Sequence, residues 1–158
     1  MPIANAHSYL TGVVGCRCEV ADNPVGSVIH VDLGPLSNRS DDQPGARMHG
    51  RYCFTIRSPW RLIENSLVVS DWNDRGGSGG DIEAALGKLI GAVVIGVQVE
   101  EPGCDIRLLF ANQSVLQVFA DSDADDDAWF VIGTDGMLVK ARPKGPGGGG
   151  LSLVSMQS

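Results

Sequence analysis

The most suggestive chemistry in the sequence lies in two cysteines separated by one residue. Cys16 and Cys18 would point to one face of an extended strand, because side chains alternate along a strand. His30 and Cys53 fall in nearby strand-like segments, so these four side chains could hold a zinc ion or supply a reactive thiol. The spacing differs from that of zinc knuckles, and buried cysteine is an ordinary core residue. We therefore expect core cysteines, with no metal or cofactor, and keep a small metal- or thiol-dependent enzyme as an alternative.

A second cluster consists of five aspartates within seven residues: Asp121, Asp123, Asp125, Asp126 and Asp127. A calcium loop would need glycine at its sixth position and glutamate at its twelfth, where this chain has aspartate and isoleucine. Two interpretations remain. The segment is a solvated loop between strands, or its negative field steers a basic partner towards the protein.

A third group contains tryptophan and arginine, which are frequent at interface hot spots. Its members are Arg57, Trp60, Arg61, Asp71, Trp72 and Asp74. We expect these residues to contact a partner, although a structural role would explain them as well. Trp129 lies in an apolar run and is expected in the core.

Motifs of the common enzyme classes are missing from the sequence. It has no nucleophile elbow, no phosphate-binding glycine loop and no His-Glu-x-x-His motif. Residues 76–80 are glycine-rich and precede a helix-like segment, but they lack the lysine of a phosphate loop and are interpreted as a linker. The sequence therefore predicts a protein that is not an enzyme.

Length and composition describe one acidic domain. The 158 residues carry 12 Lys and Arg against 19 Asp and Glu, a net charge of −7, which argues against a nucleic-acid partner.

No apolar run reaches the roughly 18 residues of a membrane helix. The N-terminus lacks the pattern of a secretory signal, and four cysteines are too few for a disulfide scaffold. The expected location is the cytoplasm.

Extended segments dominate the hydrophobic pattern. Strands are expected over residues 13–20, 28–33, 51–57, 60–63, 66–70, 93–100, 105–111, 115–120, 128–133 and 137–141. Residues 81–90 have the periodicity of an amphipathic helix. The predicted class is α+β, a large, mainly antiparallel sheet with one clear helix packed on it. Residues 1–143 would form this domain and residues 144–158 a glycine-rich tail.

A short repeat suggests two halves. Leu10-Thr-Gly resembles Leu89-Ile-Gly, 79 residues later, and extended segments follow both. One interpretation is an internal duplication of residues 5–72 and 81–141 into two pseudo-symmetric β-rich halves. The other is generic strand patterning.

Two stretches, residues 52–63 with 70–72 and residues 108–119 with Trp129, each combine a hairpin with an aromatic residue. Together they resemble small bacterial proteins, some of which are immunity proteins of polymorphic toxin systems. The resemblance covers residues 52–140 and carries over no functional residues. It implies a non-enzymatic binder of a cognate, basic toxin domain. Residues 121–127 would steer this partner and residues 57–74 would anchor it. A homodimer formed through exposed strand edges remains an alternative.

Overall fold

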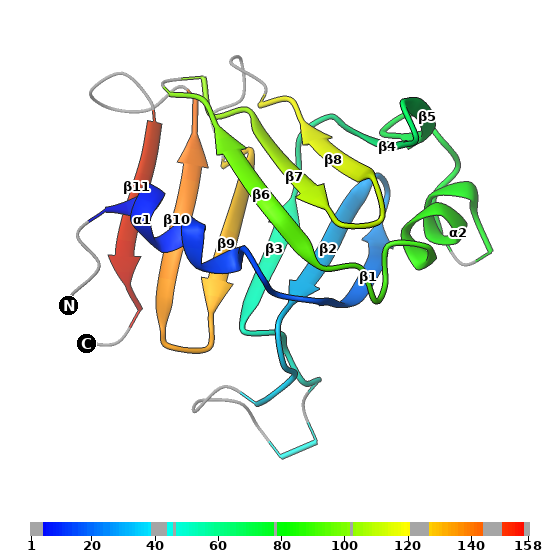
Figure 1. Cartoon of the computed structure of the whole chain (residues 1–158). Coiled ribbons are helices and arrows are strands. Elements are labelled where there is room, and N and C mark those ends of the chain that lie inside the picture. The colour runs from blue at the N-terminus through cyan, green and yellow to red at the C-terminus, as the bar shows by residue number, and fades with distance from the viewer. Residues whose placement is uncertain are drawn as a thin grey trace.

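The structure, a computed structural model, describes residues 5–38, 44–45, 47–77, 79–101, 103–120, 127–143 and 150–156. Within these ranges the chain forms two antiparallel sheets and two short helices (Figure 1). The six-stranded sheet has the order β1 (Cys18–Val25), β2 (Val28–Leu33), β3 (Tyr52–Ile56), β9 (Trp129–Gly133), β10 (Met137–Arg142) and β11 (Gly150–Ser155). The five-stranded sheet has the order β5 (Leu67–Asp71), β4 (Trp60–Glu64), β8 (Ser114–Val118), β7 (Ile106–Phe110) and β6 (Val94–Val99). The helices are α1 (Ala6–Leu10), followed by the 3₁₀ turn η1 (Thr11–Val13), and α2 (Asp81–Gly87).

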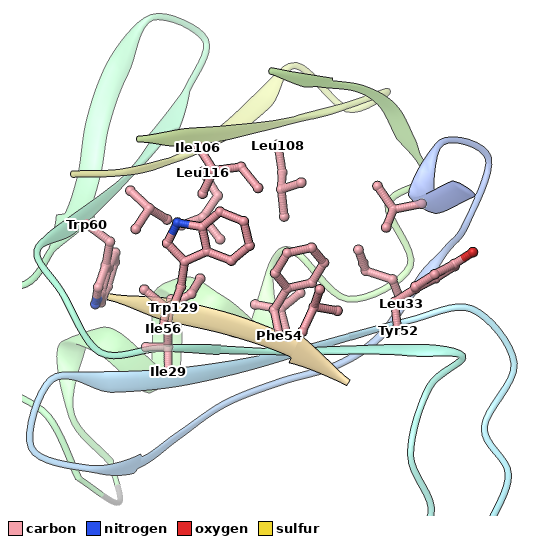
Figure 2. Close-up of a cluster of buried hydrophobic side chains, with 14 of the residues drawn as sticks. Ile29, Leu33, Tyr52, Phe54, Ile56, Trp60, Ile106, Leu108, Leu116 and Trp129 are labelled. Carbon is pink, nitrogen blue, oxygen red and sulfur yellow. The ribbon is translucent and has the colours of Figure 1, made fainter. Parts of the chain in front are cut away.

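The apolar core lies between the two sheets (Figure 2). Alternate residues of β2, Ile29, Val31 and Leu33, point into it and are fully buried. The Phe54 and Trp129 rings pack with their centroids 6.1 Å apart. Each fully buried side chain of this size stabilises the fold by roughly 1.5–3 kcal/mol.

Each half of the chain contributes a hairpin to the sheet of the other half. The β4–β5 hairpin pairs with β8, and the β9–β10 hairpin pairs with β3. Two backbone hydrogen bonds fix the crossing points, from Arg57 N to Ala128 O at 2.9 Å and from Phe119 N to Pro59 O at 2.8 Å. The strands expected from the sequence therefore divide between two sheets and do not form one large sheet, because this pairing depends on contacts distant in sequence.

The first hairpins of the two halves share a register shift at their beginning, although β1–β2 has a second shift, between Asp22 and Val25. Cys18 pairs with Leu33 in β1–β2, and a register shift separates Cys18 from Val20. In β6–β7, Val94 pairs with Phe110, and the corresponding shift separates Val94 from Gly96. The two hairpins meet at an isolated antiparallel bridge between Arg17 and Val93.

The N-terminal segment differs from the strand predicted at residues 13–20. Asn5 caps α1 by accepting a hydrogen bond from Ser8 N at 2.9 Å. Tyr9, Leu10 and Val13 are buried on one helical face. Because a helix places all three against the core, residues up to Val13 are helical and not extended. Gly15 then adopts a φ of 92°, and β1 begins at Cys18.

The C-terminal segment extends beyond the predicted domain boundary at residue 143. Residues 150–155 form β11, which pairs with β10 from Met137 to Arg142. Leu151 and Leu153 pack against the core.

The helix expected at residues 81–90 is α2, which ends at Gly87 and packs against β1 and β5. In the part of the chain described, no helix has the length and apolar character needed to cross a bilayer.

Candidate functional site

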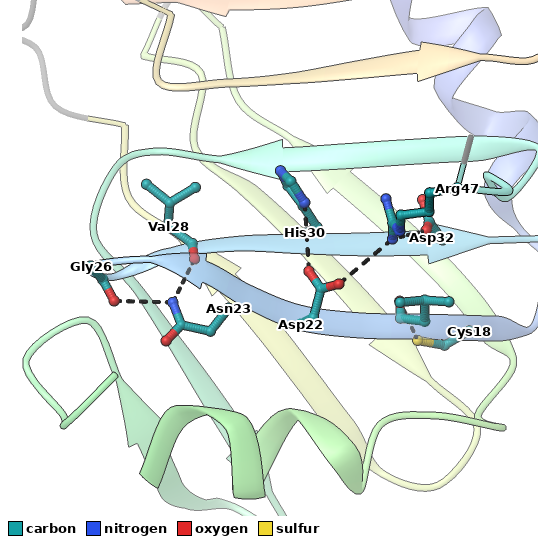
Figure 3. Close-up of polar contacts among 9 residues, drawn as sticks. Cys18, Asp22, Asn23, Gly26, Val28, His30, Asp32 and Arg47 are labelled. Atoms are coloured by element: carbon teal, nitrogen blue, oxygen red, sulfur yellow. Dashed lines mark hydrogen bonds and ion pairs between the residues drawn. The ribbon is translucent and has the colours of Figure 1, made fainter. Parts of the chain in front are cut away.

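A polar cluster lies on the outer face of β1 and β2 (Figure 3). Because Ile29, Val31 and Leu33 point inward, His30 and Asp32 point outward. Asp32 is nevertheless 0% exposed. The segment that leads into β3 packs against it so closely that a Cβ on Gly50 would lie 3.0 Å from the Asp32 Cβ.

Arg47 is the cation of this cluster. Its Nη2 donates to Asp32 Oδ2 at 2.5 Å and lies 3.7 Å from Asp22 Oδ2 (Figure 3). His30 Nδ1 lies 3.5 Å from Asp22 Oδ1. The other carboxylate oxygen of Asp32, Oδ1, is buried and has no hydrogen-bond partner among the described residues. Since a buried carboxylate is costly unless both oxygens are compensated, Arg47 alone leaves this group only partly satisfied.

The side chains of Cys53 and His49 also lie close to Asp32. Cys53 lies directly opposite Asp32 in the β2–β3 register. His49 is held by two 2.8 Å backbone hydrogen bonds with Ser37. The possible metal-binding atoms of Asp32, His49 and Cys53 all lie within 4.8 Å of one another.

This group differs from the metal or thiol site of Cys16, Cys18, His30 and Cys53, which the sequence left only as an alternative to core cysteines. Of those four residues, the structure places only Cys53 in the group. Cys16 precedes β1 and donates to Gly12 O, whereas Cys18 is buried and donates to Val20 O. Burial raises the pKa of the Cys18 thiol to about 12 and also raises the pKa of Cys16, which disfavours reactive thiolates at both positions. The alternation of β2 could have indicated Asp32. The sequence gives no signal for His49, because its position depends on the pairing with Ser37.

The predicted anchor residues lie in different environments in the structure, some buried and some exposed. Trp60 is only 1% exposed and donates its indole Nε1 hydrogen to Ser27 O, so the expectation that it contacts a partner is wrong. Trp72 is half-buried and packs against the core. Asp71 and Asp74 stabilise their own turn by accepting from Asn73 N at 2.9 Å and from Ser70 Oγ at 2.8 Å, respectively. Arg57 is exposed in the connection between β3 and β4.

Arg61 lies exposed on the outer face of the five-stranded sheet. Its Nε donates to Gln117 Oε1 at 2.5 Å, and its guanidinium carbon lies 5.2 Å from the centre of the Phe119 ring. Beside it is a groove of about 190 Å³, lined by Gln98, Glu100, Asp105, Arg107, Gln117, Val118 and Phe119. Pockets for small-molecule substrates are typically about 300–1,000 Å³, so this groove fits a side chain better than a substrate.

Of the five clustered aspartates, only Asp127 lies within the described residues. Its side chain is 12% exposed and accepts a hydrogen bond from Arg142 Nε at 3.1 Å. Asp127 therefore helps to fix the end of β10 and is poorly placed for long-range steering. Asp121, Asp123, Asp125 and Asp126 lie outside the described residues.

Comparison of the chain with protein-family models, curated proteins and solved structures finds no match.

Proposed function

We propose that the protein is a non-enzymatic binding module that neutralises a cognate toxin in the cytoplasm, as an immunity protein does. The observation that carries this proposal is the Arg61–Phe119 pair on the open sheet face. Both side chains are exposed, and Gln117 holds the guanidinium in place. Arginine and aromatic side chains are enriched at hot spots, and a guanidinium that is already ordered loses less entropy on binding.

The excess negative charge that favours a basic partner comes from the chain as a whole and not from the groove. Glu100 and Asp105 line the groove beside Phe119 together with Arg107, so the groove itself carries charges of both signs. The aspartate-rich segment begins at residue 121, two positions after Phe119, and the whole chain carries a net charge of −7. A lysine or arginine of the partner could enter the groove while the acidic segment increases the association rate.

Self-association is a second candidate, favoured by one observation on β5. This strand lies at the edge of its sheet, and Leu67, Val68 and Val69 are all exposed on it. An edge strand offers unpaired backbone groups to another chain. Light scattering at high protein concentration tests this candidate, because a strictly monomeric protein would contradict it.

We also propose that residues 5–72 and 81–141 arose by internal duplication. The matching register shift at the beginning of each first hairpin supports it, as do Gly15 and Gly91, which have φ values of 92° and 95°. These glycines are 76 residues apart, so the repeat would be shifted by three residues from the match at Leu10 and Leu89. In the resulting alignment, buried residues of the N-terminal helical segment correspond to buried residues of α2: Ala6 to Ile82, Tyr9 to Ala85, and Leu10 to Leu86.

The binding proposal is tested by affinity capture from a lysate of the source cells, at low and moderate salt. The tagged wild-type chain is compared with Arg61→Ala and Phe119→Ala. Lys140→Ala, which removes a cation from the outer face of the other sheet, is the matched control. We expect one stoichiometric basic partner that the control retains and the two variants lose. No partner, or a partner that all the variants retain, would contradict the proposal.

A further inference from the structure

We propose that Asp32, His49 and Cys53 form a binding site for a divalent transition-metal ion of the zinc type, with Arg47 as a positioning residue. The inference is independent of toxin binding, since Asp32 and Cys53 belong to the six-stranded sheet and His49 to the segment that leads into β3, whereas Arg61 belongs to the five-stranded sheet. One carboxylate oxygen, one imidazole nitrogen and one thiolate sulfur make up the mixed donor set that Zn²⁺ accepts.

The distances suit one shared ion. Zinc bonds of about 2.0–2.3 Å in a tetrahedral site place neighbouring ligand atoms roughly 3.3–3.8 Å apart. The three donor atoms here lie within 4.8 Å of one another. Side-chain rotations that move each atom by about an ångström or less would close this difference. Asp32 and Cys53 lie on paired strands, so the backbone already fixes two of the three ligands.

The position of Asp32 provides a second, independent argument. Its Oδ1 is fully buried, has no hydrogen-bond partner in the described part of the chain, and belongs to the carboxylate that faces His49 and Cys53. The pair with Arg47 accounts for Oδ2 alone. A metal ion on Oδ1 would satisfy the second oxygen, which an ordinary buried ion pair leaves uncompensated.

The local charges also balance. A dication would neutralise the Asp32 carboxylate and a Cys53 thiolate, while His49 binds as a neutral ligand. Arg47 would then remain paired with Oδ2 and with Asp22. A hydrogen bond to the second oxygen of a ligating carboxylate orients that ligand, a common arrangement around protein-bound zinc. Three protein ligands leave a fourth position for water or for a donor from a bound molecule.

Cobalt titration of the full chain tests the site, because thiolate-bound Co²⁺ has a near-ultraviolet charge-transfer band and visible bands. The chain is first stripped with a chelator. We expect both features to saturate at one equivalent of Co²⁺ and to disappear when Zn²⁺ is added, since zinc binds more tightly than cobalt. Cys53→Ser should lose the charge-transfer band, whereas the matched control Cys16→Ser should keep it. The absence of a thiolate band in the wild type, or its loss in the control alone, would overturn the proposal.

Two variants keep the test informative if Cys53→Ser does not fold. His49→Gln changes a half-buried ligand, and Arg47→Gln changes an exposed cation. Circular dichroism establishes that each variant is folded. For Arg47→Gln we expect Co²⁺ affinity about 10–100-fold weaker, and for His49→Gln a larger loss. Wild-type affinity in a folded His49→Gln chain would overturn the proposal.

Discussion

Trp60 and Trp129 make equivalent hydrogen bonds from corresponding positions of the β4–β5 and β9–β10 hairpins, the two hairpins that pair with the sheet of the other half. Each is the first residue of its hairpin, and each indole Nε1 donates at 2.8 Å to a backbone carbonyl, that of Ser27 for Trp60 and that of Cys104 for Trp129. Ser27 lies in the β1–β2 turn, and Cys104 lies in the β6–β7 connection. Each indole therefore joins one sheet to the other, at the point where a hairpin crosses between the halves of the chain.

Replacing either tryptophan by phenylalanine should destabilise the protein by about 2–4 kcal/mol. The change removes a buried hydrogen bond, leaves a carbonyl unsatisfied and opens a small cavity. Urea unfolding followed by circular dichroism measures the loss, and Trp72→Phe serves as a half-buried control with a smaller effect. Equal stability of all three variants would contradict a sheet-joining role for Trp60 and Trp129.

Alanine substitutions at Gly133 and at Gly87 should change the stability of the protein in opposite directions. A Cβ at Gly133 would collide with the Tyr9 hydroxyl and the Asp135 carboxylate, which are hydrogen-bonded to each other at 2.9 Å. Gly133→Ala should therefore cost about 1–3 kcal/mol. A Cβ at Gly87 meets nothing within 4 Å at the end of α2, so Gly87→Ala should stabilise the chain by roughly 0.5–1 kcal/mol. Shifts of the same sign in the urea midpoint would refute this pair of expectations.

The protein should lose stability as the pH rises from about 9 to 12. Burial raises the pKa of Cys18 from 9.0 to about 12 and that of Cys104 to about 11. Burial and the Asp135 hydrogen bond also raise the pKa of Tyr9. The folded state then holds protons that the unfolded chain releases, so this stability is complete below pH 9 and declines above it. Unfolding free energies across this range should fall less steeply for Cys18→Ala. An identical slope in the variant would exclude Cys18 as a contributor.

Thiol labelling should distinguish Cys16 from the other cysteines. None of the four cysteines forms a disulfide in the structure, and Cys16 alone is not buried. Native protein at pH 8 should react at one thiol, more slowly than a free cysteine, because burial raises the pKa of Cys16. Four thiols should react in urea. Peptide mass spectrometry assigns the labelled residue, and fast native labelling of Cys18 or Cys104 would contradict their burial.

Local pattern was enough to predict most strands and α2, but not the way they assemble. Alternation in β2 correctly separates Ile29 and Val31 from His30, because only one register buries the apolar set. Trp60 and Arg61 show where this reasoning fails. The two are adjacent and point to opposite faces of β4, and the pairing of β4 with β8 decides which face becomes core. α1 is too short to give a periodic signal.

The polar group around Asp32 was not predicted, for a similar reason. Cys53 was expected in the core and belonged only to an alternative metal or thiol site, which contained neither Asp32 nor His49. The sequence separates His49 from Asp32 by a polar, aperiodic stretch. The bridge between Ser37 and His49 brings them together, and no local propensity encodes such a contact.

The two hairpins that pair with the sheet of the other half also affect how the chain emerges from the ribosome. When β4 and β5 have been synthesised, the strand that β4 pairs with, β8, does not yet exist, and β3 lacks its neighbour β9. The nascent chain therefore exposes two unpaired strand edges until residues 114–133 have been translated. Contacts this distant in sequence slow folding and prolong exposure to aggregation. A pause in translation or a truncation between residues 72 and 114 would therefore leave the edges of β3 and β4 unpaired and open to aggregation.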